Sequence, residues 1–188
     1  MPGTPPPVTS EAEGLLAYLR QQRAGLANAA FGLTDEQLRA TPTKSALSVG
    51  GLLKHAAHTE QQWVDMIAGR PAASPESYYD SFGLGEGDDV ASLTAGLERV
   101  GAATETTVAG VADLGQEVQL AEGPWFPTGG GYTVRWVLLH VLEELSRHAG
   151  HADIVREHLD GATMYELMAG VEGWPASEWI TPWRPPAG

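Results

Sequence analysis

Cysteine is absent from the 188-residue chain. Its absence excludes disulfide bonds, thiolate metal ligands and a protein thiol that acts as nucleophile. Thiol chemistry at a site in this chain would therefore need a thiol from another molecule.

Basic residues are scarce as well, with 11 Lys and Arg against 24 Asp and Glu and a formal net charge of −13. The chain contains no run of basic residues. Nucleic acids and anionic membrane surfaces are bound through clustered Lys and Arg. The composition therefore argues against both kinds of partner.

Long apolar runs are also missing, since no stretch approaches the roughly 20 residues of a membrane-spanning helix. The opening stretch MPGTPPPVTS lacks the basic and apolar segments of a signal peptide. The default expectation from these absences is a cytoplasmic protein with no membrane partner.

Alternating strand patterns are absent too, whereas helical spacing and helix-capping residues recur along the chain. Ser10 with Glu13 and Thr34 with Gln37 have the spacing of capping boxes, which mark the starts of helices. The apolar spacing after these and later capping residues predicts helices at residues 11–31, 35–41, 49–69, 89–114 and 133–159.

Four long helices without any strand pattern predict an all-α four-helix bundle with one short extra helix. The loops are expected at residues 70–88 and 115–132, which are rich in Pro and Gly. We expect the bundle to span residues 10–163, after a flexible arm at residues 1–9. Residues 164–188, rich in Trp and Pro, are expected to form a short helix and an extended tail packed on the bundle.

The segment HVLEELSRHAGHAD, residues 140–153, holds three histidines and two glutamates. Each residue of a helix advances about 100° around its axis. With His140 at zero, Glu144 lies near 40°, His148 near 80° and His151 near 20°, so the four share an arc of about 80°. The spacing therefore predicts one polar stripe along this helix.

Apolar residues lie on both sides of that stripe. Trp136 and Ile154 flank it on one side, and Val141 and Leu145 flank it on the other. A solvent-exposed stripe would not be bordered in this way. We therefore expect the stripe to lie on the buried side of the helix.

Buried imidazole and carboxylate groups need polar partners, because an unpaired buried polar group costs free energy. A divalent metal would satisfy several of them at once and would take a third ligand from another helix. His55, which lies eight residues before Trp63 on the predicted helix 49–69, is the candidate. Ladders of His and Glu also form solvated pairs, so spacing alone leaves metal binding and simple polar pairing as open alternatives.

Two segments resemble a known family. GLTDEQLRATPTKSALSVGGLLKHAAHTEQQW (residues 32–63) and WVLLHVLEELSRHAGHADIVREHLDGAT (residues 136–163) are similar to the DinB-like superfamily. The similarity covers residues 11–163 in matching order. It is strongest to the branch that includes mycothiol-dependent S-transferases and maleylpyruvate isomerases.

The resemblance implies a four-helix bundle with a divalent metal held by His55, Glu144 and His148. The family pattern on the last helix is H-x-x-x-H-x-G-Q, and here Glu144 replaces the first histidine while His151 replaces the glutamine. A Glu-x-x-x-His pair is similar to the isomerase branch. The resemblance favours Zn²⁺, whereas the donor set would also suit Fe²⁺ or Ni²⁺.

The implied activity is a metal-dependent thiol transferase or isomerase that activates a low-molecular-weight, mycothiol-like thiol for attack on an electrophilic small molecule. His151 is the expected catalytic residue, and both His151 and His140 are candidates to orient the metal ligands or to shuttle protons. Arg147 and Trp125 are expected to contact the cofactor or substrate, with Trp125 in a mobile loop before the last helix. Arg147 and Arg156 would alternatively form surface salt bridges with nearby acids.

Two other functions stay open. A metal-dependent hydrolase would use a metal-bound hydroxide, with Glu143 or His151 as the base. A bundle that binds a metal without catalysis, as a sensor or a homodimeric scaffold, is the second alternative.

Overall fold

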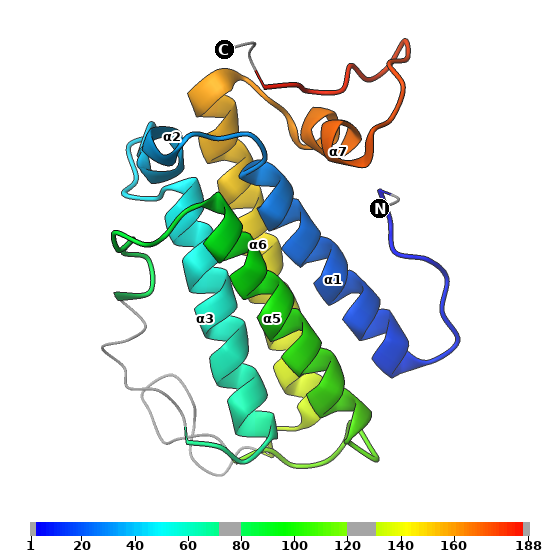
Figure 1. Cartoon of the computed structure of the whole chain (residues 1–188). Coiled ribbons are helices and arrows are strands. Elements are labelled where there is room, and N and C mark those ends of the chain that lie inside the picture. Colours follow the sequence, from blue (N-terminus) through cyan, green and yellow to red (C-terminus); the bar gives the residue numbers. More distant parts are fainter. Residues whose placement is uncertain (1–2, 72–79, 120–130, 186–188) are drawn as a thin grey trace.

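Four long helices lie lengthwise against one another in the computed structural model of this chain (Figure 1), which describes residues 3–71, 80–119 and 131–185. The regular elements in these ranges are α1 (Glu11–Ala29), α2 (Asp35–Arg39), α3 (Val49–Ile67), α5 (Val90–Ala109), α6 (Val134–Asp160) and α7 (Met164–Glu172). Over the same ranges the only strand-like pairing is an isolated bridge between Glu117 and Thr133. The predicted all-α bundle is confirmed.

The helices begin where their capping residues predict. Ser10, Thr34, Ser48 and Thr133 each accept a hydrogen bond from a backbone N–H in the first turn of the helix that follows. Because such bonds satisfy N–H groups that lack a partner within the helix, they fix the start of each element.

The helix predicted at residues 89–114 ends much earlier than expected, whereas the ends of the other predicted helices agree within two residues. The apolar spacing extends to Leu114, but α5 stops at Ala109 and Gly110 caps it. Beyond this point Asp113 Oδ1 accepts a hydrogen bond from the backbone N–H of Gly115 at 2.9 Å. An aspartate side chain that bonds its neighbouring backbone favours a turn over a helix, which explains the difference.

The packing order places α3 and α6 side by side. α6 packs against α1 and α3, and α5 packs against α3 and α1. The apolar faces of all four helices meet in one core, whose fully buried leucines include Leu19, Leu26, Leu52, Leu53, Leu97, Leu138 and Leu145. No helix within the described ranges is long and apolar enough to cross a membrane.

A buried ion pair ties α1 to α3 inside this core. Arg23 Nη1 donates to Glu60 Oε1 at 2.6 Å, and the hydroxyl of Thr104 donates to the same oxygen at 2.5 Å. A Cβ atom at Gly101 would lie 2.7 Å from Arg23 Nε, so the glycine makes room for the guanidinium group. Burial raises the pKa of Glu60, while the charge of Arg23 opposes that rise.

The segment of residues 81–88 lies across the first half of α3. A Cβ atom at Gly51 would come within 2.6 Å of the carbonyl oxygen of Phe82, so only glycine allows this close approach. Lys54 Nζ donates to the carbonyl oxygen of Gly83 at 2.7 Å and to Asp88 Oδ2 at 2.8 Å. We call residues 81–88 the strap, because they are fastened along α3.

Arg156 is fully buried, so the expected surface salt bridge is wrong for this residue. It does pair with a nearby acid, Asp160, but its Nη1 also donates to the carbonyl oxygens of Ala29 and Phe31, both at 2.8 Å. The guanidinium carbon lies 4.5 Å from the ring centre of Trp183. Arg156 therefore joins α6 to the end of α1 and to the C-terminal segment.

At the N-terminal side, Gln21 Nε2 donates to the carbonyl oxygen of Gly3 at 2.6 Å, and α7 packs against α1. The predicted boundaries of arm, bundle and tail stay predictions.

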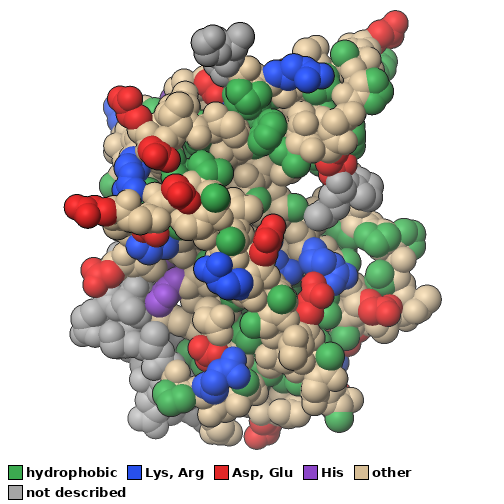
Figure 2. All heavy atoms as spheres, viewed as in Figure 1, with side chains coloured by type: hydrophobic (Ala, Val, Ile, Leu, Met, Phe, Trp, Pro, Cys, Tyr) green, Lys and Arg blue, Asp and Glu red, His purple; other side chains and the backbone are tan. Residues whose placement is uncertain are grey.

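On the face drawn in Figure 2, Lys and Arg side chains are scattered among acidic ones rather than gathered in one patch.

Arg156 and Arg147 form a matched pair for a stability test, since each has an acidic partner four residues away on α6. Arg156→Leu leaves Asp160 and two carbonyl groups without their donor, so we expect a loss of about 3 kcal/mol in the free energy of unfolding. Arg147→Leu removes only an exposed pair and should cost less than about 0.5 kcal/mol. Urea unfolding measures both, and equal losses would contradict the structural role of Arg156.

Candidate metal centre

Three side chains from two adjacent helices meet inside the bundle. His55 comes from α3, and Glu144 and His148 come from α6. Their potential ligand atoms all lie within 4.8 Å of one another. His55 and His148 are buried and Glu144 is half-buried. The structure thus brings together the three residues that the sequence predicted, in a cluster that fits a divalent metal.

Helix geometry explains the convergence. Glu144 and His148 are one turn apart on α6, and Glu144 Oε2 lies 3.4 Å from His148 Nε2. The rings of His55 and His148 meet edge to face, with centroids 4.8 Å apart and planes at 82°. Neighbouring helices therefore direct two imidazoles and one carboxylate to the same point.

His148 is the unusual member of this cluster. Both of its ring nitrogens are buried, and neither has a hydrogen-bond partner among the described residues. The 3.4 Å approach to Glu144 brings the two side chains close without the geometry of a hydrogen bond. A buried polar group without a partner costs about 1–3 kcal/mol. A metal ion would remove this cost at one nitrogen, so the donor set fits a cation.

His55 has contacts on both ring nitrogens and on one ring face. Ser81 Oγ lies 2.7 Å from Nδ1, and Thr59 Oγ1 lies 3.3 Å from Nε2. The ring of Phe82 stacks on the imidazole, with centroids 3.7 Å apart and planes at 13°. Ser81 and Phe82 belong to the strap, and neither was expected from the sequence, where residues 70–88 indicated only a loop.

The charge states of the cluster suit a metal site. Burial is the main reason that the pKa of His55 is lowered to about 4, and the neighbouring His148 lowers it further. The contact with His148 holds the pKa of Glu144 below its usual value, against the opposing effect of burial. At neutral pH His55 is therefore neutral and Glu144 ionised, which are the forms that bind metals.

A comparison with protein families shows to which family the chain belongs. The model of the family described as Mycothiol-S-transferase matches residues 14–161. The chain belongs to this family. The resemblance noted in the sequence is thereby confirmed, whereas no curated protein matches the chain.

A solved structure supports the fold. The crystal structure titled as that of the conserved protein of locus from Enterococcus faecalis matches this mycothiol S-transferase family member with a TM-score of 0.61. The two chains are 14% identical, and the match covers 82% of this chain and 100% of the other. At this identity the likeness shows a shared fold and nothing about activity.

In this mycothiol S-transferase family member the predicted stripe is only partly buried. His148 is buried, whereas His151 is exposed and Ile154 is 55% exposed, so the expectation of a wholly buried stripe is wrong. The most buried positions of α6, such as Leu145 and Ala152, lie at about 120–140° on the same wheel. His151, near 20°, therefore lies at the edge of the buried face, beside His148 at 5.7 Å between ring centroids.

His140 takes part in an aromatic group rather than in the ligand set. Its ring stacks on Trp136, with centroids 5.1 Å apart and planes at 12°, and it meets the edge of Trp63 at 4.7 Å. Tyr132 contacts Trp136 in turn, at 4.7 Å between centroids. This group lies along α3 and α6, one to two helical turns from the His55 cluster.

The two predicted cofactor contacts are still untested. Arg147 is exposed, and its Nη2 donates to Glu143 Oε1 at 2.8 Å, which is the salt bridge that the sequence left open. Trp125 lies outside the described residues. Their roles toward a cofactor stay predictions.

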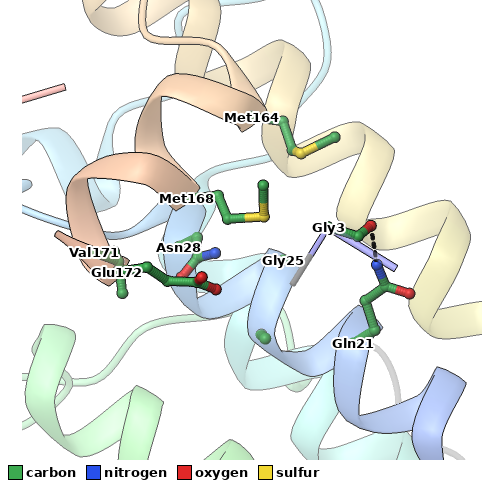
Figure 3. A pocket seen from close by; sticks show the side chains of 9 residues that line it. Gly3, Gln21, Gly25, Asn28, Met164, Met168, Val171 and Glu172 are labelled. Carbon is green, nitrogen blue, oxygen red and sulfur yellow. Dashed lines mark hydrogen bonds between the residues drawn. The ribbon is translucent and has the colours of Figure 1, made fainter. Parts of the chain in front are cut away.

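A pocket of about 260 Å³ lies elsewhere, between the N-terminal arm, α1 and α7 (Figure 3). Its lining includes Asn28, Met164, Met168 and Glu172, and none of the three candidate ligands. This pocket is therefore separate from the metal centre.

The pKa of His55 gives a prediction for the metal-free protein. This pKa is about 4 in the folded state, against an ordinary value of 6.5 for an exposed histidine, so the unfolded chain binds the proton more tightly. Stability is then lost as the pH falls from 6.5 through 4, by about 2 kcal/mol between pH 7 and pH 5. Urea unfolding at these two pH values, after removal of metal, measures this loss.

His55→Gln, which cannot be protonated in this range, is the comparison variant. Its loss of stability between pH 7 and pH 5 should be smaller than that of the wild type by the same about 2 kcal/mol. Equal losses in the two proteins would show that His55 is not the group responsible.

Proposed function

We propose that this protein is a metal-dependent thiol transferase, in which His55, Glu144 and His148 hold one divalent metal ion. The observation that carries the proposal is the buried His148 ring, whose nitrogens lack hydrogen-bond partners among the described residues beside a carboxylate and a second imidazole. Membership of the mycothiol S-transferase family supports the same function.

The donor set favours a catalytic metal site. Three protein ligands leave at least one coordination position open, whereas structural zinc sites use four. Two imidazoles and a carboxylate suit Zn²⁺, which we favour, as well as Fe²⁺ or Ni²⁺. A divalent ion bound there would stabilise the thiolate form of an incoming low-molecular-weight thiol at neutral pH.

The side chains of the site define how the thiol reacts. Neutral His55 and ionised Glu144 would leave a positive charge at the ion, which favours an anionic sulfur. We assign the thiol proton to His151, which is exposed to solvent at the edge of the buried face. The sulfur then forms a bond to an electrophilic carbon of the small molecule, and the π bond or leaving-group bond at that carbon breaks. The atom that receives the displaced electron pair takes the proton from His151. Since the chain has no cysteine, the thiol supplies the only reactive sulfur.

A hydrolase is the less favoured alternative. Glu143, one candidate base for it, is more than half exposed and paired with Arg147 on the outer side of α6. A base must reach the water that attacks the substrate, and Glu143 instead lies outside the ligand cluster. His151, the other candidate base, would serve either reaction, so membership of the mycothiol S-transferase family is what favours the transferase.

Two further residues, Arg147 and Trp125, have proposed roles in the same activity. We propose that Arg147 leaves Glu143 to bind an anionic group of the thiol, and that Trp125 contacts the substrate. We also propose that the reaction takes place in the cytoplasm, where thiols are kept reduced, and that the protein can act as a homodimer.

Replacement of His148 tests the metal site. His148→Ala should lose stoichiometric zinc yet stay folded, because it removes two buried nitrogens that have no hydrogen-bond partner among the described residues. Elemental analysis after equilibration with zinc and dialysis measures metal content. His158→Ala is the control, since His158 is exposed and bonds only the carbonyl oxygen of Ile154 in the described structure. Full zinc content in His148→Ala would refute the proposed site.

Replacement of His151 tests its catalytic role. His151→Ala should keep its zinc and lose about 10²–10⁴-fold in the rate of thiol addition to a model electrophile, as expected for removal of a general base. The rate is followed by consumption of the thiol. If His151→Ala loses zinc as completely as His55→Ala, then His151 is a ligand and the assignment is wrong.

A further inference from the structure

The strap residue Ser81 makes the closest polar contact with His55 that the described structure shows. Ser81 Oγ lies 2.7 Å from Nδ1, and both side chains are buried, with 5% and 0% of the residue exposed. The contact of Thr59 Oγ1 with Nε2 is longer, at 3.3 Å. Nδ1 is therefore the more firmly held nitrogen of the ring.

Phe82, the next residue of the strap, fixes the plane of the same ring. It stacks on His55 at 3.7 Å between centroids and approaches His148 at 6.0 Å, with planes at 70°. Ser81 thus limits rotation of the imidazole within its plane, and Phe82 limits its tilt. Two successive residues of one segment together define the orientation of His55.

Contacts away from the site hold the strap in this position. Gly51 allows the carbonyl of Phe82 to lie directly on α3, and Lys54 bonds Gly83 and Asp88 at 2.7 and 2.8 Å. Gly51 and Lys54 lie on α3, the same helix that carries His55. The strap is therefore held in a fixed position relative to the His55 ring.

We propose that Ser81 is a positioning residue for the metal centre: its Oγ accepts a hydrogen bond from Nδ1–H of His55 and so directs the lone pair of Nε2 toward the ion. This inference rests on the proposed function. A ring nitrogen can bind a metal only when it carries no proton, and the hydrogen bond of the other nitrogen selects that tautomer. Thr59 donates to Nε2 in the metal-free protein and yields that lone pair to the ion.

The opposite tautomer of His55, with the proton on Nε2, would form hydrogen bonds in the opposite directions. Ser81 would then donate to Nδ1, Nε2–H would donate to Thr59, and Nε2 would have no lone pair for a metal. The two hydrogen-bond patterns have the same heavy-atom positions, so a measurement that detects the proton separates them. A hydroxyl partner also orients the ring without adding negative charge beside the ion.

The test uses ¹⁵N-labelled, metal-free full chain and long-range ¹H–¹⁵N spectra at neutral pH. The signals of His55 are assigned by their loss in His55→Gln. We expect the wild type and Ser81→Thr to carry the proton on Nδ1, and Ser81→Ala to shift toward the Nε2–H form. Ser146→Ala, which removes an exposed hydroxyl on α6 bonded to the carbonyl of Leu142, is the control and should leave the signals unchanged.

Zinc affinity, measured by competition with a chelator, is the second readout. Ser81→Ala should bind zinc roughly 10–100-fold more weakly, as is typical when a partner of a metal ligand is lost. Ser81→Thr should restore affinity because it keeps the hydroxyl. Gly51→Ala, which displaces the strap through Phe82 and changes no polar side chain, should weaken binding in the same direction.

The inference is overturned if Ser81→Ala keeps the Nδ1–H form of His55 and binds zinc within about threefold of the wild type. It is also overturned if the wild type carries the proton on Nε2. A wild-type protein that binds no zinc would instead contradict the proposed function, while the tautomer spectra would still decide what Ser81 does.

Discussion

The need of a buried imidazole for a polar partner is the constraint on which the site depends. His148 lies on the packed side of α6, and neither of its nitrogens finds a hydrogen bond within the described ranges. A well-packed bundle would normally place an apolar residue at such a position. The stability lost there is about 1–3 kcal/mol, and a metal ion shared with His55 and Glu144 is the simplest means of recovering it.

The rest of the structure serves to keep the three donors together. α3 and α6 pack side by side, the Arg23–Glu60 pair ties α3 to α1, and the strap fixes the ring of His55. The three donors lie on helices rather than on loops, so their geometry is set before any metal arrives. A site that is already in the right form loses little entropy when it binds an ion.

Much of the fold and the donor set could be predicted from the sequence, because both depend on local spacing. Capping residues marked the helix starts, and the four-residue interval placed Glu144 and His148 on one face. A helical wheel gives angles but not the direction of neighbouring helices, which is why His151 and Ile154 were expected to be buried. The sequence analysis expected Arg156 at the surface and did not identify Ser81 as part of the site. In both cases the reason is that partners of the residue lie far away in the sequence. Gly50 and Gly51 were the available signal of a segment lying against α3, because Cβ atoms at these positions would collide with Leu84 and with the carbonyl oxygen of Phe82.

The most direct test of the metal centre is a crystal structure of zinc-loaded protein, with anomalous diffraction recorded on both sides of the zinc absorption edge. We predict one anomalous peak between α3 and α6, with His55, Glu144 and His148 donor atoms about 2.0–2.2 Å from it and one further position open. Fully loaded protein whose anomalous peak lies elsewhere, or whose three side chains point apart, would contradict the central claim.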